Sequence, residues 1–141
     1  MPTRKASATW EGGFQAGSGS FKGESGAIDG AFTAGSRFSE EQGSNPEELL
    51  AAAHAACFSM AFSLQLDRAG HPPDRVHTDA ACTIEKVGEG FEITTMKLTT
   101  RGKVPGIDAA EFQELANNAK EGCPVSKALS SVRIELDAAL E

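Results

Sequence analysis

The sequence is short of positive charge and of cysteine. Thirteen lysine and arginine residues stand against twenty aspartate and glutamate residues, which gives the 141 residues a net charge of −7. Nucleic acids and anionic membranes attract basic surfaces, so we expect neither as a partner. Three cysteines are an odd number and too few for a secreted disulfide scaffold. We therefore expect free thiols in a reducing cytoplasm, where disulfides are more often transient than structural.

Long hydrophobic runs are also missing. The N-terminal residues MPTRKASATWEGG have no apolar core and no cleavage pattern, so we expect no signal peptide. The longest nearly apolar stretch, 49–64, is interrupted by His54 and Ser59 and is slightly short for a membrane span. It is better interpreted as a buried helix. Length and an apolar content of 40% indicate one folded domain over 1–141.

The first half of the chain predicts a hairpin, an arm and a long helix. Residues 5–11 and 18–24 have the pattern of a β-hairpin. The glycine- and serine-rich arm, 25–45, contains short extended pieces around 27–28 and 31–38. Asn45 and Pro46 are typical of a helix start, and Glu48 stands where a capping box has its acid. The helix is expected from Pro46 to about Arg68. Its middle is apolar all round, so it should lie in the core of the fold or of an interface.

The second half predicts two strands, two helices and a final strand. They are expected at 76–87, 90–101, 109–121, from Pro124 onward, and at 132–136. Asp108 should cap the first of these helices, and Cys123 should directly precede the second. This order of elements predicts an α+β fold.

Two cysteines lie in contrasting surroundings. Cys57 is in the middle of the apolar helix, where burial raises the pKa of a thiol and makes it inert unless a cation lies nearby. Cys123 begins a short helix, whose free N–H groups favour a thiolate. Local electrostatics alone therefore make Cys123 the better nucleophile. Cys82 lies in a predicted strand, where we expect it to contribute packing only.

Two side chains are candidate cations for Cys57. His54 lies three residues earlier on the same helix face. Arg37, in the segment SRF of the arm, would serve better because arginine stays charged at any relevant pH. Glu47, in the first helical turn, could pair with Arg37 and fix its guanidinium against a thiol. A solvated arginine and a first-turn acid favoured by the helix dipole are the plainer interpretations.

Other chemistry at the same residues has weaker support. His54, Cys57 and Cys123 would give three zinc ligands, but no CxxC pair and no HExxH motif accompanies them. A Cys–His hydrolase pair on one helix would be poorly placed for proton transfer and lacks an orienting third group. We expect no metal site.

Four segments carry a resemblance to a known family. They are SRF (36–38), GSNPEELLAAAHAACFSM (43–60), PGID (105–108) and GCPVSKAL (122–129). With the order of strands and helices, they resemble the OsmC/Ohr family of thiol peroxidases, and its OsmC branch in particular. Ohr-type chains carry their arginine in the first glycine-rich loop, which has none here, and tend to have tyrosine at the position of His54.

The resemblance implies roles and partners. Cys57 would be the peroxidatic cysteine, Cys123 the resolving cysteine, Arg37 the activating cation and Glu47 the group that orients it. Organic hydroperoxides would be the preferred substrates, with hydrogen peroxide reduced less well. No cofactor would be bound, and an external dithiol, of the lipoyl type by analogy, would be the reductant. A non-turnover redox sensor or binding protein, and a zinc-stabilised interaction domain, remain as alternatives.

The resemblance also implies an intertwined homodimer with its active sites at the subunit interface. Helix geometry agrees, because the ten residues between Glu47 and Cys57 span roughly 15 Å along one axis. Two such helices packed antiparallel would bring Glu47 of one chain near Cys57 of the other. We therefore predict an obligate dimer. Phe38, Phe58 and Met60 are candidate neighbours of the substrate.

Overall fold

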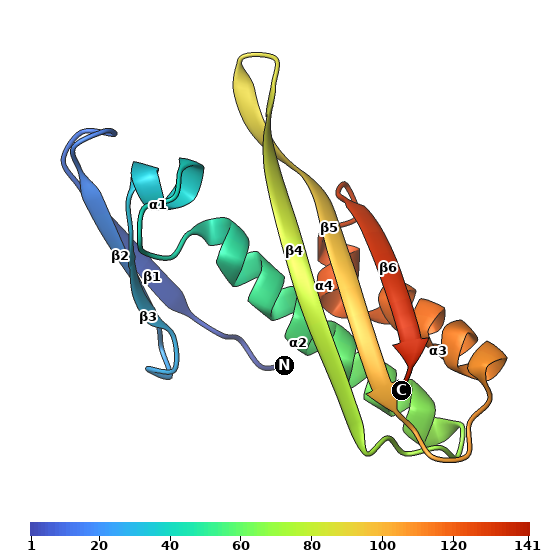
Figure 1. Ribbon diagram of the computed structural model, residues 1–141. Helices are drawn as coiled ribbons and strands as arrows, with labels where there is room; N and C mark the ends of the chain where they lie inside the picture. Colours follow the sequence, from blue (N-terminus) through green and yellow to red (C-terminus); the bar gives the residue numbers. More distant parts are fainter. The chain divides into compact units, whose positions relative to one another are not determined.

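In the computed structural model, which describes residues 1–141, the chain divides after Leu49 into two units (Figure 1). The N-terminal unit is Met1–Leu49 and the C-terminal unit is Leu50–Glu141. Each unit has a three-stranded sheet of its own. The single domain expected over 1–141 stays a prediction.

The N-terminal sheet is antiparallel, with the strand order β1-β2-β3. Its strands are β1 (Ala6–Glu11), β2 (Ser18–Gly23) and β3 (Asp29–Phe32). The pairing of β1 with β2 confirms the predicted hairpin. The rings of Trp10 and Phe21 both lie against Phe32, with centroid distances of 5.5 and 5.9 Å. All six residues of β1 are exposed, so neither face of this edge strand is covered.

The segment 31–38 differs from the prediction of extended structure. After β3 the chain forms a short helix, α1 (Ala34–Phe38). The Thr33 hydroxyl accepts a hydrogen bond from the Ser36 N–H, and the Thr33 N–H donates to the Ser36 hydroxyl. This reciprocal capping box satisfies N–H groups that a helix start leaves free, and it nucleates a turn that composition alone does not suggest. The expectation of an extended piece is confirmed for Ala31 and Phe32, which belong to β3, and is wrong for 34–38.

The long helix α2 (Pro46–Arg68) begins and ends at the predicted residues. Asn45 is the N-cap, because its Oδ1 accepts a hydrogen bond of 2.8 Å from the Glu48 N–H. The Glu48 carboxylate accepts from the Ser44 hydroxyl at 2.7 Å instead of closing a capping box. Beyond the helix, Gly70 has a φ of 85°, which glycine adopts without strain.

The C-terminal unit contains a mixed sheet with the order β4-β5-β6 (Figure 1). The strands β4 (Arg75–Val87) and β5 (Gly90–Lys103) form the predicted antiparallel pair. The last strand, β6 (Arg133–Leu140), is longer than the predicted 132–136 and lies parallel to β5. Parallel neighbours need a crossover, which α3 (Ala109–Gly122) and α4 (Pro124–Ala128) supply. Asp108 caps α3 as predicted, accepting from the Glu111 N–H at 2.8 Å.

One face of the C-terminal sheet packs against helices. The core consists of Phe58, Phe62, Leu66, Met96, Leu98, Val104, Ile107, Phe112, Ala116 and Ala119. Alternation along β5 turns Met96, Leu98 and Thr100 inward, where side chains from α2 and α3 meet them. Helices and strands thus contribute to one core, which confirms the predicted α+β fold.

The helix α2 buries only one of its faces. Met60 and Leu64 are 76% and 46% exposed, and the exposed residues Ala52 and Ala56 precede them at the same four-residue spacing. The expectation that α2 lies in a core therefore holds for one face within a single chain. By length and composition α2 would also be able to cross a membrane. Its packing against the sheet is that of a core helix.

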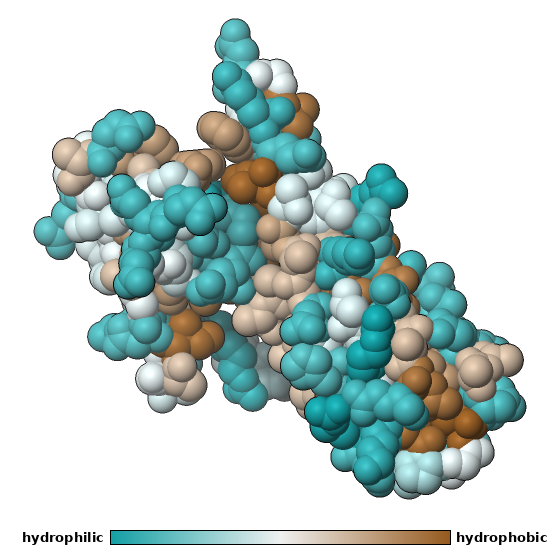
Figure 2. Space-filling model, viewed as in Figure 1, coloured by the Kyte–Doolittle hydropathy of each residue, from teal (hydrophilic) through white to brown (hydrophobic).

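The hairpin between β4 and β5 carries a second group of exposed apolar side chains. Val87 and Phe91 are 45% and 56% exposed, and Figure 2 shows hydrophobic atoms on this projecting end of the sheet. The register of the two strands shifts between Thr83 and Ile84. Such an irregularity increases the local twist and turns the hairpin end away from a flat sheet.

A glycine in β5 gives a test of this core. A Cβ added at Gly102 would lie 2.7 Å from Cε2 of Phe112, a fully buried ring in edge contact with Phe62. Because that ring cannot move aside, Gly102→Ala is expected to lower the free energy of unfolding by about 1–3 kcal/mol. Gly90→Ala is the matched control, since its Cβ would meet nothing within 4 Å. Equal urea unfolding curves for the two variants would contradict the packing described.

Candidate functional site

The sulfur atoms of Cys57 and Cys123 lie 2.8 Å apart. Cys57 comes from the middle of α2, and Cys123 lies between α3 and α4. Both thiols are free, with Cys123 fully buried and Cys57 partly exposed. The structure thus brings together two cysteines that are 66 residues apart in the chain.

The junction of α3 and α4 positions Cys123. Its N–H closes the last turn of α3 by donating to the carbonyl of Ala119 at 2.9 Å, and Pro124 then opens α4. Cys123 is the C-cap of one helix and the N-cap of the next, with extended backbone angles of −61° and 125°. The backbone N–H groups of Val125 and Ser126 are consequently available to the Cys123 sulfur.

The two thiols have opposite acidities within the C-terminal unit. Burial raises the pKa of Cys57, and its contact with Cys123 raises it further, against one backbone hydrogen bond from Val125. Burial also acts to raise the pKa of Cys123. The hydrogen bonds that it shares with Cys57, Ser126 and Val125 outweigh burial, so its pKa lies below the usual value. These surroundings favour the thiolate at Cys123, as local reasoning from the sequence predicts.

Arg37 and Glu47 form a two-pronged ion pair in the N-terminal unit. Nη2 of Arg37 lies 2.8 Å from Oε1 of Glu47, and Nε lies 3.1 and 3.3 Å from the two carboxylate oxygens. Glu47 is only 6% exposed, whereas a third of the arginine side chain is open to solvent. The pair expected from the sequence is present, and two contacts fix the plane of the guanidinium.

Local hydrogen bonds bring α1 to the start of α2. The Asn45 amide donates to the Ser36 carbonyl at 2.9 Å, and the Ser36 hydroxyl donates to the Ser44 carbonyl at 2.8 Å. These contacts place Arg37, in the last turn of α1, beside Glu47, in the first turn of α2. Side-chain to backbone bonds of this kind take the place of an apolar core in this small unit.

An aromatic pocket of about 320 Å³ lies beside the Arg37 guanidinium. Its lining residues are Trp10, Phe14, Phe32, Thr33, Ala34, Arg37 and Phe38. The Phe38 ring centroid is 5.2 Å from the guanidinium carbon, within cation–π distance. Of these residues, the sequence analysis named only Arg37 and Phe38 as candidates for the site. The other aromatic residues, Trp10, Phe14 and Phe32, could have been found from the sequence, because aromatic side chains in a glycine-rich segment without a hydrophobic core indicate a binding surface.

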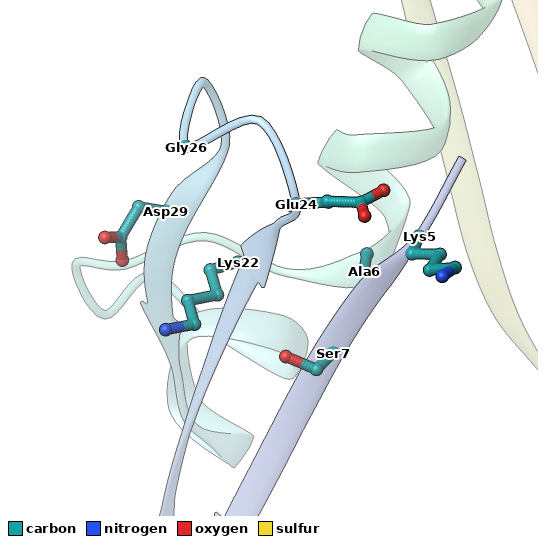
Figure 3. Close-up of a pocket in the computed structure, with 8 residues that line it drawn as sticks. Lys5, Ala6, Ser7, Lys22, Glu24, Gly26 and Asp29 are labelled. Carbon is teal, nitrogen blue, oxygen red and sulfur yellow. The ribbon is translucent and has the colours of Figure 1, made fainter. Parts of the chain in front are cut away.

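The other two residues expected near a substrate belong to the C-terminal unit. Phe58 is fully buried in the core of the C-terminal unit, and Met60 is exposed on α2. Figure 3 shows a different surface pocket, between strands of the N-terminal sheet, whose lining residues include Lys5, Lys22 and Asp29. The ammonium groups of the two lysines point in different directions, so this pocket has no converging charge (Figure 3).

His54 is buried and is not the cation considered from the sequence. Its Nε2 lies 2.7 Å from Oγ of Ser126, and burial lowers its pKa, so the ring is neutral near pH 7. The structure contains no group of three or more His, Cys, Asp or Glu side chains arranged to hold a metal ion. Cys82 is partly buried and packs against the core, as expected.

Comparison with known proteins agrees with these features. Residues 39–137 match the family model described as OsmC-like protein. Peroxiredoxin OsmC of Escherichia coli K12 is 46% identical over 135 residues, which cover 95% of this chain and 94% of that protein. An organic hydroperoxide resistance protein of Xanthomonas axonopodis pv. citri is 38% identical over 61% of this chain and 59% of its own length.

Solved structures show the same fold. An organic hydroperoxide resistance protein from Elizabethkingia anophelis matches with a TM-score of 0.77 and 26% identity, covering 100% of this chain and 98% of that one. OhrB of Bacillus subtilis matches with a TM-score of 0.71 and 27% identity, covering 96% and 98%. The family match over most of the residues, together with the identity to the Escherichia coli protein, shows that the chain belongs to the OsmC family.

Proposed function

We propose that this chain is a cysteine-based peroxidase that reduces organic hydroperoxides to alcohols. The observation that carries the proposal is the pair of free sulfurs 2.8 Å apart. Its relatives are named peroxiredoxin and organic hydroperoxide resistance protein, which supports a redox role involving peroxides. The free thiols are also consistent with a reaction in the reducing cytoplasm.

The proposed cycle has three steps. The Cys57 thiolate attacks the distal oxygen of ROOH, so that an S–O bond forms, the O–O bond breaks and the alkoxide leaves as ROH after taking a proton. Cys123 then attacks the sulfenic sulfur of Cys57, the S–S bond forms, and hydroxide leaves as water with a second proton. An external dithiol, of the lipoyl type in our proposal, returns two electrons and restores both thiols.

The first step needs a cation at Cys57, and we assign that role to Arg37. The surroundings of Cys57 within its own unit raise its pKa, so ionisation depends on a charge from outside the unit. Arg37 is permanently charged, and Glu47 fixes its orientation through two hydrogen bonds. An opposite charge within about 4–6 Å lowers a thiol pKa by roughly one to three units, enough to offset burial.

The aromatic pocket beside Arg37 supports an organic substrate. Its walls are the rings of Trp10, Phe14, Phe32 and Phe38, which offer apolar surface to an alkyl or aryl group. Hydrogen peroxide has no such group and gains nothing from these walls. The preference for organic hydroperoxides over hydrogen peroxide therefore belongs to the proposal.

Two uncovered surfaces support an obligate homodimer. Every residue of β1 is exposed on both faces, and α2 exposes an apolar row of Ala52, Ala56, Met60 and Leu64. The small alanine side chains permit close approach of a second helix. Along α2, the ten residues from Glu47 to Cys57 span roughly 15 Å. The Arg37–Glu47 pair of one chain is therefore better placed to approach Cys57 of the partner subunit than the Cys57 of its own chain.

The dimer is expected to persist on dilution. Light scattering and sedimentation should give twice the chain mass at micromolar protein, and activity per chain should stay constant down to nanomolar concentration. A charge placed in the apolar row, Met60→Glu, is expected to weaken the dimer and lower activity together. The exposed substitution Lys97→Glu, on the strand β5, is the charge control. A fully active monomer would overturn the prediction.

Multiple turnover tests the proposed function. With dihydrolipoamide in excess, the wild-type chain should consume many equivalents of cumene hydroperoxide, and fewer of hydrogen peroxide, per active site. A parallel assay with thioredoxin compares the reductants. Consumption of a single equivalent would indicate a redox sensor instead. Stoichiometric zinc in the purified protein, lost together with its fold on chelation, would indicate an interaction domain.

A further inference from the structure

His54 is a fully buried imidazole with one nitrogen occupied and the other without a partner. Nε2 lies 2.7 Å from Oγ of Ser126, and Nδ1 has no hydrogen-bond partner. Ser126 is the third residue of α4, whose N-cap is Cys123, and its hydroxyl and N–H both act to lower the pKa of the Cys123 thiol. The sulfur of Cys123 in turn lies 2.8 Å from the sulfur of Cys57. A row of polar groups therefore leads from α2 through the first turn of α4 back to the two thiols, entirely within the C-terminal unit.

The partnerless nitrogen determines the direction of the hydrogen bonds in this row. A neutral imidazole carries one proton, and burial keeps His54 neutral. A proton on Nδ1 would leave a buried N–H with no acceptor, and orphaned buried donors are rarer than unfilled acceptors. The proton therefore lies on Nε2 and is donated to Ser126. The Ser126 O–H is then left to donate, and we infer that its acceptor is the sulfur of the N-cap residue Cys123, three residues earlier.

We propose that His54 is a positioning residue for Cys123: its Nε2–H fixes the Ser126 hydroxyl as a donor, and that hydroxyl holds Cys123 as the thiolate facing Cys57. The catalytic meaning of this arrangement rests on the proposed peroxidase function. The effect of His54 and Ser126 on the ionisation of Cys123 does not depend on that function and can be measured without any peroxide.

In the peroxidase cycle the arrangement acts on the resolving step. The Cys123 thiolate attacks the sulfenic sulfur of Cys57, the S–S bond forms, and the S–O bond breaks. The departing hydroxide becomes water by taking up the one proton that Cys123 gave up on ionising. A hydroxyl that only donates favours the thiolate over the thiol, so more of Cys123 is ready to react near neutral pH. The lifetime of the sulfenic acid then depends on His54 and Ser126.

The first test measures the thiolate directly. In a Cys57→Ser, Cys82→Ser background the only thiol is Cys123. Because this thiol is buried, its rate of alkylation by iodoacetamide at pH 7 is taken relative to the limiting rate of the same variant at high pH, and that relative rate reports its ionised fraction. Adding Ser126→Ala should slow alkylation about tenfold, the change that corresponds to one pKa unit. Adding Ser126→Thr, which keeps the hydroxyl, should restore most of the rate. Equal rates for the Ala and Thr variants would overturn the proposal.

A second pair of variants isolates the nitrogen that matters. His54→Gln places an amide N–H near the position of Nε2, whereas the shorter His54→Asn reaches only the position of Nδ1. Both introduce a buried amide, so their thermal stabilities serve as the check on folding. Glutamine is expected to keep alkylation within about twofold of the parent, and asparagine to slow it about tenfold. Indistinguishable rates in variants of equal stability would contradict the role given to Nε2.

The third test links the row of polar groups to turnover. With one equivalent of cumene hydroperoxide and all three cysteines present, Ser126→Ala should raise the ratio of dimedone-trapped Cys57 sulfenic acid to disulfide about tenfold. Slower alkylation without accumulation of sulfenic acid would mean that the proposed peroxidase cycle fails while the effect of Ser126 on Cys123 stands. An unchanged alkylation rate would mean that Ser126 does not act on Cys123.

Discussion

The Cys57→Ser variant is expected to lose all turnover of cumene hydroperoxide, down to the rate of dithiol and peroxide mixed without protein. Serine keeps the size and loses the thiolate, which is the nucleophile of the first step. The matched control is Cys82→Ser, since Cys82 is a partly buried cysteine that packs against the core. Coupled steady-state assays should show wild-type turnover for this control.

The same experiment decides which sulfur reacts first. The lowered pKa of Cys123 would suggest this cysteine as the nucleophile. Our assignment predicts that Cys123→Ser still reacts once with hydroperoxide and stops at a Cys57 sulfenic acid, visible by dimedone trapping and mass spectrometry. If Cys57→Ser instead gave a trapped sulfenic acid at Cys123 and Cys123→Ser did not react, the two roles would have to be exchanged.

Removing the cation is expected to have the second largest effect. Arg37→Ala should lower kcat/KM for cumene hydroperoxide by about tenfold to a thousandfold, because loss of a charge near a buried thiol raises its pKa by roughly one to three units. The change also leaves the buried Glu47 carboxylate without its partner. A fall in Tm is therefore expected as well.

Arg37→Lys separates charge from geometry. Lysine keeps the positive charge but cannot make the two parallel contacts with Glu47, so activity is expected between wild type and alanine. Recovery of activity toward higher pH, where an unassisted thiol ionises, should be larger for Arg37→Ala than for wild type. Full activity of Arg37→Ala at neutral pH would show that the cation at Cys57 comes from elsewhere.

Most secondary structure could be predicted because its boundaries depend on local chemistry. The start of α2 follows from the Asn45 cap and Pro46, and its end from Gly70 and the prolines beyond. The failure at α1 has the same origin: Thr33 and Ser36 form a capping box in a segment whose composition favours no regular structure. The extension of β6 to Leu140 depends on pairing with β5, which no local pattern encodes.

The site could be predicted in part. Arg37 and Glu47 are ten residues apart in sequence, and their pairing follows from charge and position. The order of acidity expected for the two thiols from local electrostatics agrees with the directions of their pKa shifts within the unit. The contact between Cys57 and Cys123 came from the family pattern, since helix spacing does not bring α2 to the α3–α4 junction. The bond between His54 and Ser126 joins residues 72 apart and was not predicted.

The position of Cys123 between α3 and α4 affects how the proposed disulfide can form. Because its sulfur already lies 2.8 Å from that of Cys57 in the dithiol form, we expect the proposed disulfide to close without local unfolding of α3 or α4. In a protein whose two cysteines are far apart, a helix has to unfold locally before the disulfide can form, and the rate of the reaction then depends on the local stability of that helix. In this protein α3 and α4 do not have to unfold, so we expect that substitutions that stabilise these helices will not slow disulfide formation.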